Sequence, residues 1–391
     1  MIMTDNNENK VLNVPHLRFP EFSGEWEIYP LTDFMSFKNG MNPDAKRFGR
    51  GTKFISVMDI LNNQFICYDN IRASVEVVDG DIETYGVNYG DILFQRSSET
   101  LEDVGQANVY LDSKPAVFGG FVIRGKSKSN YYPMFFRYLL ASPTARKKII
   151  VKGAGAQHFN IGQDGLSKVC LNIPSIQEQE KIAKLFECID TRIATQNKII
   201  EDLKKLKSAI SLKMLHSDSW EQFKIQDIAS IGRGRVISSV EISQQENPLY
   251  PVYSSQTSND GIMGYLDDFM FEGEYISWTT DGANAGTVFY RNGKFNCTNV
   301  CGLLKLKKGF DAHFVSLVLA EATRMYVSTN LANPKLMNNT MGNIQIRLPK
   351  LEEQKRISVV FRKLHGLLET HNSLIIKYSK QKQYLLSQMF I

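Results

Sequence analysis

Two stretches of the chain repeat apolar residues at the spacing of a long amphipathic helix. Residues 176–215 contain neither proline nor glycine. Their apolar residues follow one heptad frame, at Ile182, Leu185, Ile189, Ile199, Leu203, Leu206 and Ile210. The same phase returns a whole number of heptads later, at Ile357, Val360, Leu364, Leu367, Leu374, Tyr378 and Leu385. This pattern predicts two long helices, each with an apolar seam.

The two predicted helices also share their polar details. Gln196 and His371 occupy the same seam position, where a buried polar pair would fix the register at some cost in stability. Pro174 and Pro349 stand just before the helices, where a proline needs no backbone donor. Two matched helices in one chain are expected to pair with each other. The alternative is that each helix folds onto its own globular neighbour.

The rest of the chain alternates short apolar runs with Gly, Asn and Asp, which is typical of strands separated by turns. In the first half we expect strands at 53–57, 91–94, 116–118 and 120–123, and a helix at 133–150. In the second half we expect strands at 250–254, 275–279, 287–290 and 302–306, and a helix at 312–327. The predicted fold class is α+β, with two mixed α/β globular bodies that each precede a long helix.

The beginning of each body carries the same local sequence. Residues 23–33 return as 217–227, with Trp26 matched by Trp220. The same spacing continues to Gly40 and Gly234. The chain therefore contains the start of one unit twice.

The end of each body is also repeated, at a shorter spacing. Residues 173–179 recur as 348–354, so the second body is shorter than the first. The repeat predicts an N-terminal arm at 1–22, a body at 23–173, a helix at 174–216, a second body at 217–348 and a second helix at 349–391. Two unequal bodies on a common frame suggest two binding modules with different specificities.

Composition adds only broad limits. The chain has 391 residues, of which 43% are hydrophobic and 22% charged, as in ordinary globular proteins. Residues 1–10 lack the features of a secretory signal, and the five cysteines have no framework spacing, so we expect a cytoplasmic protein with reduced thiols. The net charge of +5 permits a polyanionic partner without requiring one.

Motifs for catalysis are missing from the sequence. It contains no phosphate-binding G-x-x-x-x-G-K-[ST], no G-x-G-x-x-G after a strand and no G-x-S-x-G. Residues 333–336 read Asn-Pro-Lys-Leu and depart from the Asn-Pro-Pro-aromatic element of amino-methyltransferases. Cys297 and Cys301 fit core thiols better than a metal site, and Asp281 fits a turn better than a catalytic acid. We expect no catalytic, cofactor-binding or metal-binding residue.

Groups that suit nucleic acid occur in both bodies. Lys and Arg bind phosphates, and Arg, Asn and Gln make bidentate contacts with base edges. Each cluster alone fits an ordinary solvated loop, but clusters of different identity recur at corresponding places in the two copies. The DNA-binding candidates are Lys46, Arg47, Arg50, Arg96, Lys147, Lys148, Lys152, Gln157, His158, Asn160, Arg233, Arg235, Ser255, Gln256, Asn299, Lys335 and Asn338.

Taken together, the sequence resembles the specificity subunit of Type I restriction–modification enzymes. The resemblance rests on residues 15–22 (PHLRFPEF) with Trp26, on Trp220, and on residues 90–93 and 251–255. It rests above all on Pro-x-[Ile/Leu]-x-Glu-Gln-x-[Lys/Arg]-Ile, which opens both predicted helices. The match extends over nearly the whole chain.

The resemblance implies a division of labour. Each body would be a target recognition domain that reads one half of a split sequence in double-stranded DNA. The helices would form an antiparallel coiled coil that spaces the readers and docks two modification (methyltransferase) subunits. The seam and partner residues would include Ile182, Leu185, Ile189, Gln196, Leu203, Ile357, Val360, Leu364, His371 and Leu385.

In such a complex the chemistry belongs to other subunits. S-adenosylmethionine would be used by the modification subunits, and ATP and Mg by restriction subunits that translocate and cleave DNA. The chain itself would be non-catalytic and would need no cofactor of its own. A helix pair of roughly 40 residues, about 60 Å long, would hold two readers one to two DNA turns apart. The alternative is a protein–protein scaffold with two binding modules on a coiled coil.

Overall fold

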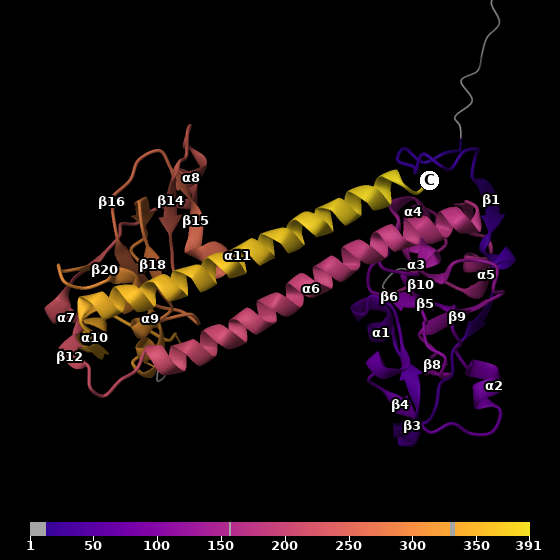
Figure 1. The fold of residues 1–391 in the computed structure, drawn as a ribbon, viewed down its shortest axis with the longest axis horizontal. Coiled ribbons are helices and arrows are strands. Elements are labelled where there is room, and N and C mark those ends of the chain that lie inside the picture. Colours follow the sequence, from indigo (N-terminus) through magenta and orange to yellow (C-terminus); the bar gives the residue numbers. More distant parts are fainter. Residues whose placement is uncertain (1–12, 156–157, 329–332) are drawn as a thin grey trace, which may run out of the picture. The chain divides into compact units, whose positions relative to one another are not determined.

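The chain folds into two compact units in a computed structural model, which describes residues 13–155, 158–328 and 333–391 (Figure 1). Unit 1 comprises residues up to Asn197 together with Ser373–Ile391, and unit 2 comprises Lys198–Asn372. The boundary therefore crosses both long helices, so each unit holds one globular body and one half of each helix. The mixed α/β character expected from the sequence is confirmed.

Unit 1 is built on two main sheets with small helices around them. A four-stranded sheet has the order β2-β9-β5-β7, a three-stranded sheet has the order β4-β3-β8, and two small pairs join β1 to β11 and β6 to β10. The strands are β1 (Glu27–Pro30), β2 (Met35–Asn39), β3 (Phe48–Ile55), β4 (Ser74–Val75), β5 (Ile92–Gln95), β6 (Ser97–Ser98), β7 (Ala107–Val109), β8 (Val117–Phe118), β9 (Val122–Ser127), β10 (Phe159–Asn160) and β11 (Cys170–Ile173). The helices of the body are α1 (Val57–Asn62), α2 (Asp81–Tyr85), α3 (Pro133–Ala141), α4 (Pro143–Ile150) and α5 (Gln163–Ser167).

Unit 2 repeats this plan in a shorter stretch of chain. Its sheets have the orders β13-β20-β17-β18 and β15-β14-β19-β16, and β12 pairs with β21. The strands are β12 (Glu221–Lys224), β13 (Ala229–Arg233), β14 (Tyr250–Tyr253), β15 (Ile262–Leu266), β16 (Phe271–Glu272), β17 (Tyr275–Thr279), β18 (Val288–Arg291), β19 (Lys294–Cys297), β20 (Cys301–Leu306) and β21 (Gln345–Leu348). The helices of the body are α7 (Ile225–Ile228), α8 (Ser239–Ser243), α9 (Ala312–Ala322) and α10 (Asn338–Asn343).

The strand pair that closes each body shows why the sequence repeats at two spacings. In β1 and β11 the register is Glu27 opposite Ile173, and in β12 and β21 it is Glu221 opposite Leu348. The strands that open the two bodies, β1 and β12, are farther apart in the sequence than the strands that close them, β11 and β21. The same pairing therefore forms around bodies of different length. The repeated sequence thus encodes the frame of each unit, and the length difference lies inside the body.

The repeated glycines are required by close backbone approach. A Cβ at Gly40 would lie 2.1 Å from the carbonyl oxygen of Gly119, and a Cβ at Gly234 would lie 1.6 Å from the carbonyl oxygen of Cys297. Both distances are far below van der Waals contact, so neither position tolerates a side chain without backbone movement. The two glycines serve the same crossing in the two bodies.

The long helices lie where the heptad pattern predicts them. Helix α6 spans Ile176–Met214 over 39 residues, and α11 spans Leu351–Gln388 over 38 residues. In unit 1 they run in opposite directions, because Asp190 contacts Lys382 and Arg192 lies over the ring of Tyr378. In unit 2 the other halves of the two helices also run in opposite directions. Ile210, near the end of α6, packs on the core cluster that contains Ile357, near the start of α11. The predicted antiparallel pairing is confirmed.

Most of the predicted seam positions are buried or half-buried, and two are exposed. The positions at 182, 189, 196, 203 and 210, and their counterparts at 357, 364, 371, 378 and 385, are buried or half-buried. Residues four positions after several of these are buried or half-buried as well: Phe186, Ile193, Ile200, Phe361, Leu368 and Ile375. Leu206 and Leu367, which were assigned to the seam, are 47% and 46% exposed, and Leu185 and Val360 are only half-buried.

The shorter helices also depart from their predicted bounds. The helix expected at 133–150 is two helices, because Ser142 is extended and its hydroxyl caps α4 by accepting a hydrogen bond from the Ala145 N–H at 3.2 Å. The helix expected at 312–327 ends at Ala322 and continues as a single 3-10 turn, Thr323–Met325. A proline at position 143 disfavours helical geometry in the residue before it, which explains the first break.

A repeated glutamine attaches each body to its long helix. In unit 1 the side chain of Gln179 accepts a hydrogen bond from the Tyr132 N–H at 3.0 Å and donates to the carbonyl of Pro174 at 3.0 Å. In unit 2 Gln354 accepts from the Asp311 N–H at 2.9 Å and donates to the carbonyl of Pro349 at 2.8 Å. Both glutamines are buried, so each satisfies two backbone groups that would otherwise lack a partner.

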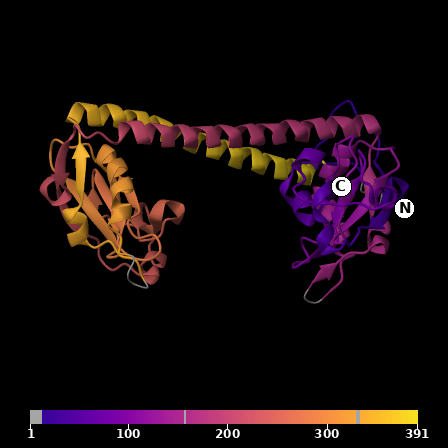
Figure 2. The ribbon, with the colours of Figure 1, turned by 90° about the horizontal axis from the view of Figure 1, so that it is seen from below.

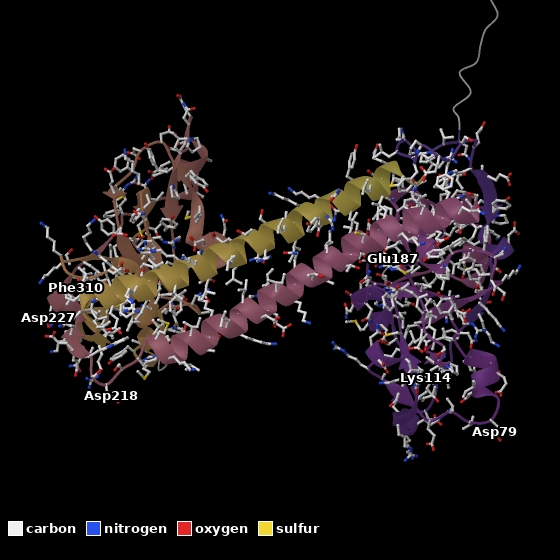
Figure 3. The ribbon with its side chains drawn as sticks, in the orientation of Figure 1. Asp79, Lys114, Glu187, Asp218, Asp227 and Phe310 are labelled. Atoms are coloured by element: carbon white, nitrogen blue, oxygen red, sulfur yellow. The ribbon has the colours of Figure 1, made fainter. Side chains whose placement is uncertain are left out.

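The core of each unit lies between its sheet, its longest body helix and its share of α6 and α11. In unit 1, Trp26 packs edge-on against Phe135 and Phe390. In unit 2, Trp220 packs edge-on against Phe314, and Phe310 lies at the edge of that core (Figure 3). Among the described residues, no helix combines the length and apolar character needed to cross a membrane.

Candidate nucleic-acid interface

In unit 1 the structure brings together three loops that are distant in the sequence. Strand β6 pairs with β10, which places Ser97 opposite Asn160. The backbone of Arg96 is held on both sides, by the carbonyl of Phe121 at 2.9 Å and by the N–H of Ile161 at 3.0 Å. Its guanidinium donates to the carbonyl of Gly120 at 3.2 Å. Residues 96–98, 119–121 and 158–160 thus form one surface, which we call loop surface 1.

Loop surface 1 contains several of the predicted DNA-binding residues. His158 and Asn160 are exposed, and the Asn160 side chain is oriented by a hydrogen bond from the Ser97 hydroxyl. Lys152 is exposed at the start of the same hairpin. Gln157 lies outside the residues that the structure describes. Figure 2 shows the short strand β10, drawn in magenta, on the side of the unit 1 body that faces away from α6.

Unit 2 forms the same arrangement with different side chains. Asp281 pairs with Lys335, as Ser97 pairs with Asn160 in unit 1. The Thr280 N–H donates to the carbonyl of Val300 at 3.3 Å, and its carbonyl accepts from the Leu336 N–H at 2.8 Å, which repeats both backbone bonds of Arg96. Residues 280–282, 298–300 and 333–338, with Arg233, form loop surface 2.

Three predicted residues meet on loop surface 2. The Arg233 guanidinium donates to Asn338 Oδ1 at 2.9 Å and to the carbonyl of Asn299 at 3.4 Å. Asn299 is exposed, whereas Lys335 and Asn338 are half-buried. Arg233 is therefore held in place by its neighbours, which suits a residue that presents a fixed donor to a ligand. The backbone frame of the two loop surfaces is the same and the polar groups on it differ.

Other predicted residues already use their charge within the protein. Arg47 pairs with Asp81 and Arg50 with Glu76, the latter at 2.7 Å, while neighbouring Lys46 is exposed. The pKa of Asp81 lies below its usual value because its carboxylate accepts the backbone N–H of Val78 and then because Arg47 is close. These two arginines belong to the β3–β4 region, and each has an acidic partner there.

Two further groups of candidates lie elsewhere in the bodies. Arg235 forms a paired contact with the carboxylate of Glu241, which raises the pKa of the guanidinium. Gln256 donates to the carbonyl of Ile262, and Ser255 is half-buried beside it, so this loop is held by its own polar groups. Both sets have structural partners that the sequence did not reveal.

Helix α4 presents the remaining pair of cations. Lys147 is exposed and Lys148 is half-buried. Their neighbour Arg146 instead donates to the carbonyls of Glu102 at 2.8 Å and Val104 at 2.6 Å, and burial lowers the pKa of its guanidinium. Of this basic run, the two lysines are available to a polyanion and the arginine supports the fold.

In the described part of the chain, no group of three or more His, Cys, Asp or Glu side chains lies close enough together to hold a metal ion. Cys297 and Cys301 are buried in an apolar cluster with Phe295 and Leu303, and burial raises the pKa of the Cys297 thiol. They are core thiols, as the sequence indicated.

Comparison with protein families decides the relationship. The model of the Type I restriction modification DNA specificity domain matches residues 23–205 and 217–377, once for each repeat. This chain belongs to that family.

Individual relatives agree with the family assignment. Two putative type I specificity subunits of Mycoplasma pneumoniae are 35% identical over 233 residues and 36% identical over 241 residues. Each match covers 58% of this chain, and 97% and 94% of the respective relative. The MpnII specificity subunit from the same organism is 41% identical over 177 residues, which cover 44% of this chain and 53% of that one.

Solved structures show the same fold at low sequence identity. The S subunit of a Type I restriction–modification system from M. genitalium superimposes with a TM-score of 0.65 at 14% identity, covering 97% of this chain and 99% of that one. A chain from a structure on complex assembly of a type I R-M system gives 0.55 at 12% identity, covering 92% and 96%. The specificity-subunit fold is therefore shared across nearly the full length.

Sequence reasoning missed two residues on these specificity-subunit surfaces. Phe121 is 69% exposed and follows the glycine whose carbonyl binds Arg96, so loop surface 1 presents an aromatic residue as well as a cation. On loop surface 2, exposed Met337 lies against the guanidinium of Arg233. The sequence signal for Phe121 is an aromatic residue directly after two glycines.

Proposed function

We propose that this chain is the DNA sequence-specificity subunit of a Type I restriction–modification complex, and that loop surfaces 1 and 2 each read one half of a bipartite target. The observation that carries the proposal is the duplicated backbone frame. At equivalent positions the frame presents Arg96 and Asn160 in unit 1, and Thr280 and Lys335 in unit 2. Different donors and acceptors on one frame would select different bases.

The helices would then space the readers and dock methyltransferase subunits. A helix of 39 residues is about 58 Å long, which exceeds one turn of DNA. Apolar side chains that the helix pair leaves exposed support docking: Leu206, Leu367, Ile376 and Tyr384 are 46–57% exposed. Leu206 and Leu367 belong to unit 2, and Ile376 and Tyr384 belong to unit 1, so each unit offers exposed apolar side chains on its part of the helices.

In this proposal the chain is a non-catalytic cytoplasmic protein. Two modification subunits would supply S-adenosylmethionine-dependent methyl transfer, and restriction subunits would supply ATP- and Mg-dependent cleavage. The test is exchange of the second body. Replacing residues 220–348 by those of another family member, and mapping methylated adenines in cells that carry the partner subunits, should change one half-site and preserve the other. A change in both halves would contradict independent reading.

The salt dependence of binding separates this function from a protein–protein scaffold. Binding that neutralises phosphates weakens steeply as salt rises, because counterions are released from DNA. Replacement of Lys147 by Ala should weaken binding to all DNA sequences alike, and it should lower the slope of log affinity against log salt concentration by about one. Absence of DNA binding by the complex at low salt would favour the scaffold instead.

A further inference from the structure

The two repeats differ at the point where the body meets the start of the long helix. In unit 1 the carboxylate of Glu178 is buried under the segment that precedes Trp26. Arg18 reaches it with two bonds, from Nε and Nη2, both at 2.8 Å, and the Trp26 indole N–H donates to it at 3.3 Å. The Arg18 guanidinium also donates to the carbonyl of Ser23 at 3.3 Å. An irregular arm with one arginine thus covers this site.

In unit 2 the same site is uncovered. The counterpart of Glu178 in the second Pro-to-Gln repeat is Glu353, and its side chain is exposed. Within the described residues its carboxylate makes no hydrogen bond or ion pair. The counterpart of Trp26 is Trp220, which is half-buried where Trp26 is only 2% exposed. The same tryptophan–glutamate pair is present without its cover.

The segment of the second repeat that corresponds to the arm does not supply the cover. In the register that matches Trp26 with Trp220, the counterpart of Arg18 is Leu212, which lies within α6 and is 76% exposed. The repeat therefore replaces the arm by the end of a helix. The arginine that would complete the second site is absent from the sequence of this repeat.

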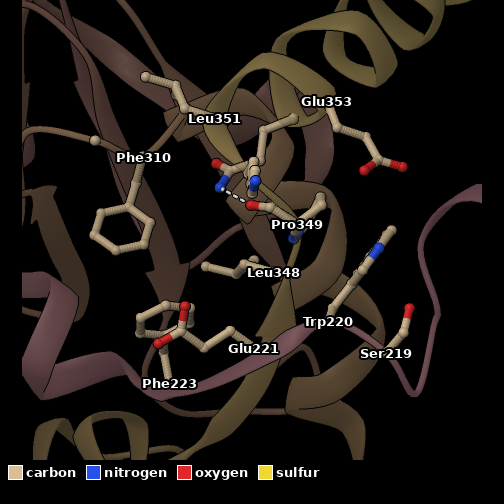
Figure 4. Close-up of a pocket in the computed structure, with 12 residues that line it drawn as sticks. Ser219, Trp220, Glu221, Phe223, Phe310, Leu348, Pro349, Leu351 and Glu353 are labelled. Atoms are coloured by element: carbon tan, nitrogen blue, oxygen red, sulfur yellow. Dashed lines mark hydrogen bonds between the residues drawn. The ribbon is translucent and has the colours of Figure 1, made fainter.

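An open pocket marks the uncovered site (Figure 4). Its volume is about 490 Å³, against about 330 Å³ for the corresponding pocket in unit 1, whose wall includes Arg18. Figure 4 shows Trp220 and Glu353 on one side and Phe223 and Phe310 on the other. Glu221 also lines the pocket, and Lys350 is the cation among its lining residues. The pocket combines aromatic walls with a net negative charge.

We propose that this pocket receives an irregular segment of another polypeptide, in which an arginine stands between apolar residues. The repeat shows what fits, because the unit 1 site holds Arg18, and the neighbouring Phe19 packs on the core of that unit. A guanidinium would form a bidentate pair with Glu353 and lie near the Trp220 ring. Nucleic acid does not suit the pocket, since Glu221 and Glu353 repel phosphate.

A second copy of this chain is a poor occupant. Its own arm is held by the two Arg18–Glu178 bonds and by a hydrogen bond from the Leu17 N–H to the carbonyl of Gln388 at 3.0 Å. Releasing the arm would leave Glu178 buried without its cation. The partner is therefore a different protein, and the inference does not depend on how the loop surfaces read DNA.

The test uses the full chain and a fluorescent peptide of residues 13–22 as the arginine-bearing probe. We expect saturable binding with a dissociation constant of about 10 μM to 1 mM, measured by anisotropy. Glu353→Gln should weaken it about tenfold or more, as loss of a charge-assisted pair does. The neighbouring exposed residue gives the control, Glu352→Gln, which should leave binding unchanged.

A charge exchange makes the assignment specific. Glu353→Arg should abolish binding of the native peptide and restore binding of a peptide that carries Arg18→Glu. Because Glu353 is exposed, these variants should keep the parental circular dichroism spectrum. Lack of saturable binding, or binding that ignores Glu353→Gln, would overturn the proposal. Self-association of the chain that Glu353→Gln abolishes would assign the pocket to a second copy and overturn it as well.

Discussion

Lys382 donates a hydrogen bond to Asp190 at 2.6 Å, across 192 positions of sequence. Asp190 also accepts from the Tyr138 hydroxyl at 2.8 Å, and its side chain is only 10% exposed. This triad joins the end of α11 to the beginning of α6 and to α3. The triad lies where the two helices and the first body meet. Variants of it therefore measure how much polar contacts contribute to the stability of that junction.

Lys382→Met should therefore destabilise unit 1 by about 1–3 kcal/mol, because it removes a charged hydrogen bond and leaves the Asp190 carboxylate partly buried. Urea unfolding monitored by circular dichroism would measure the change. Lys380→Met is the matched control, since Lys380 is exposed on the same helix. Equal stability of the two variants would show that the triad contributes no net stability.

The buried pair at the arm gives a second prediction. Arg18→Met should cost about 3–5 kcal/mol in unit 1, because Glu178 would keep a buried charge without its partner. The double variant Arg18→Met/Glu178→Met should recover much of that loss. Arg50→Met, which removes an exposed pair with Glu76, should leave the free energy of unfolding nearly unchanged. A small effect at both arginines would mean that the arm adds little to stability.

His313 makes the stability of unit 2 dependent on pH. Burial, and then the charge of Arg362, lower its pKa to about 4. Its ring nitrogen contacts the Ser358 hydroxyl at 2.8 Å and its ring lies edge-on to Tyr290. The other groups that act on it are Asp311, His365 and Lys207.

The folded state holds His313 neutral, whereas the unfolded chain binds a proton near pH 6.5. The stability that this residue contributes is thus present above pH 6.5 and is lost as the pH falls toward 4. With allowance for partial exposure, the loss should be about 1–2 kcal/mol. His313→Gln should remove that part of the slope in denaturation measured at several pH values, and His16→Gln, at an exposed site, should not.

The antiparallel register determines how the proposed spacer can be lengthened. Because Asp190 lies beside Lys382, a heptad inserted after Asn197 in α6 must be matched by one after Leu374 in α11. The pair should then grow by about 10 Å, which corresponds to about three base pairs. We expect a methylated target with unchanged half-sites and a longer gap. An active variant with an unchanged gap would show that the helices do not set the spacing.

Features with local signals were predictable from the sequence. The start of α6 at Ile176 follows from the absence of Pro and Gly after Pro174, and β17 has the bounds that its apolar run indicated. Apolar residues stand both three and four positions after Ile182, Gln196, Ile357, Leu364 and His371, and the predicted seam included only the first set. The globular bodies pack on the second set, which includes Phe186 and Phe361, and the sequence alone does not show where the bodies lie.

The candidate interface depended on contacts that cross the sequence. The pairing of β6 with β10 joins strands that are far apart in the chain, so it was not visible in any local cluster. The ion pairs of Arg47 and Arg50 were not visible in the sequence, because their acidic partners stand 34 and 26 positions away. The roles of the loop residues in base reading stay predictions.

The hydrogen bond from Leu17 to the carbonyl of Gln388 brings the opening segment of the chain against the end of its last helix. The core of unit 1 contains Met389 and Phe390 as well as Trp26 and Phe135. During synthesis this core can close only after α11 has been made. The body that is made first therefore completes its core after the second body has left the ribosome.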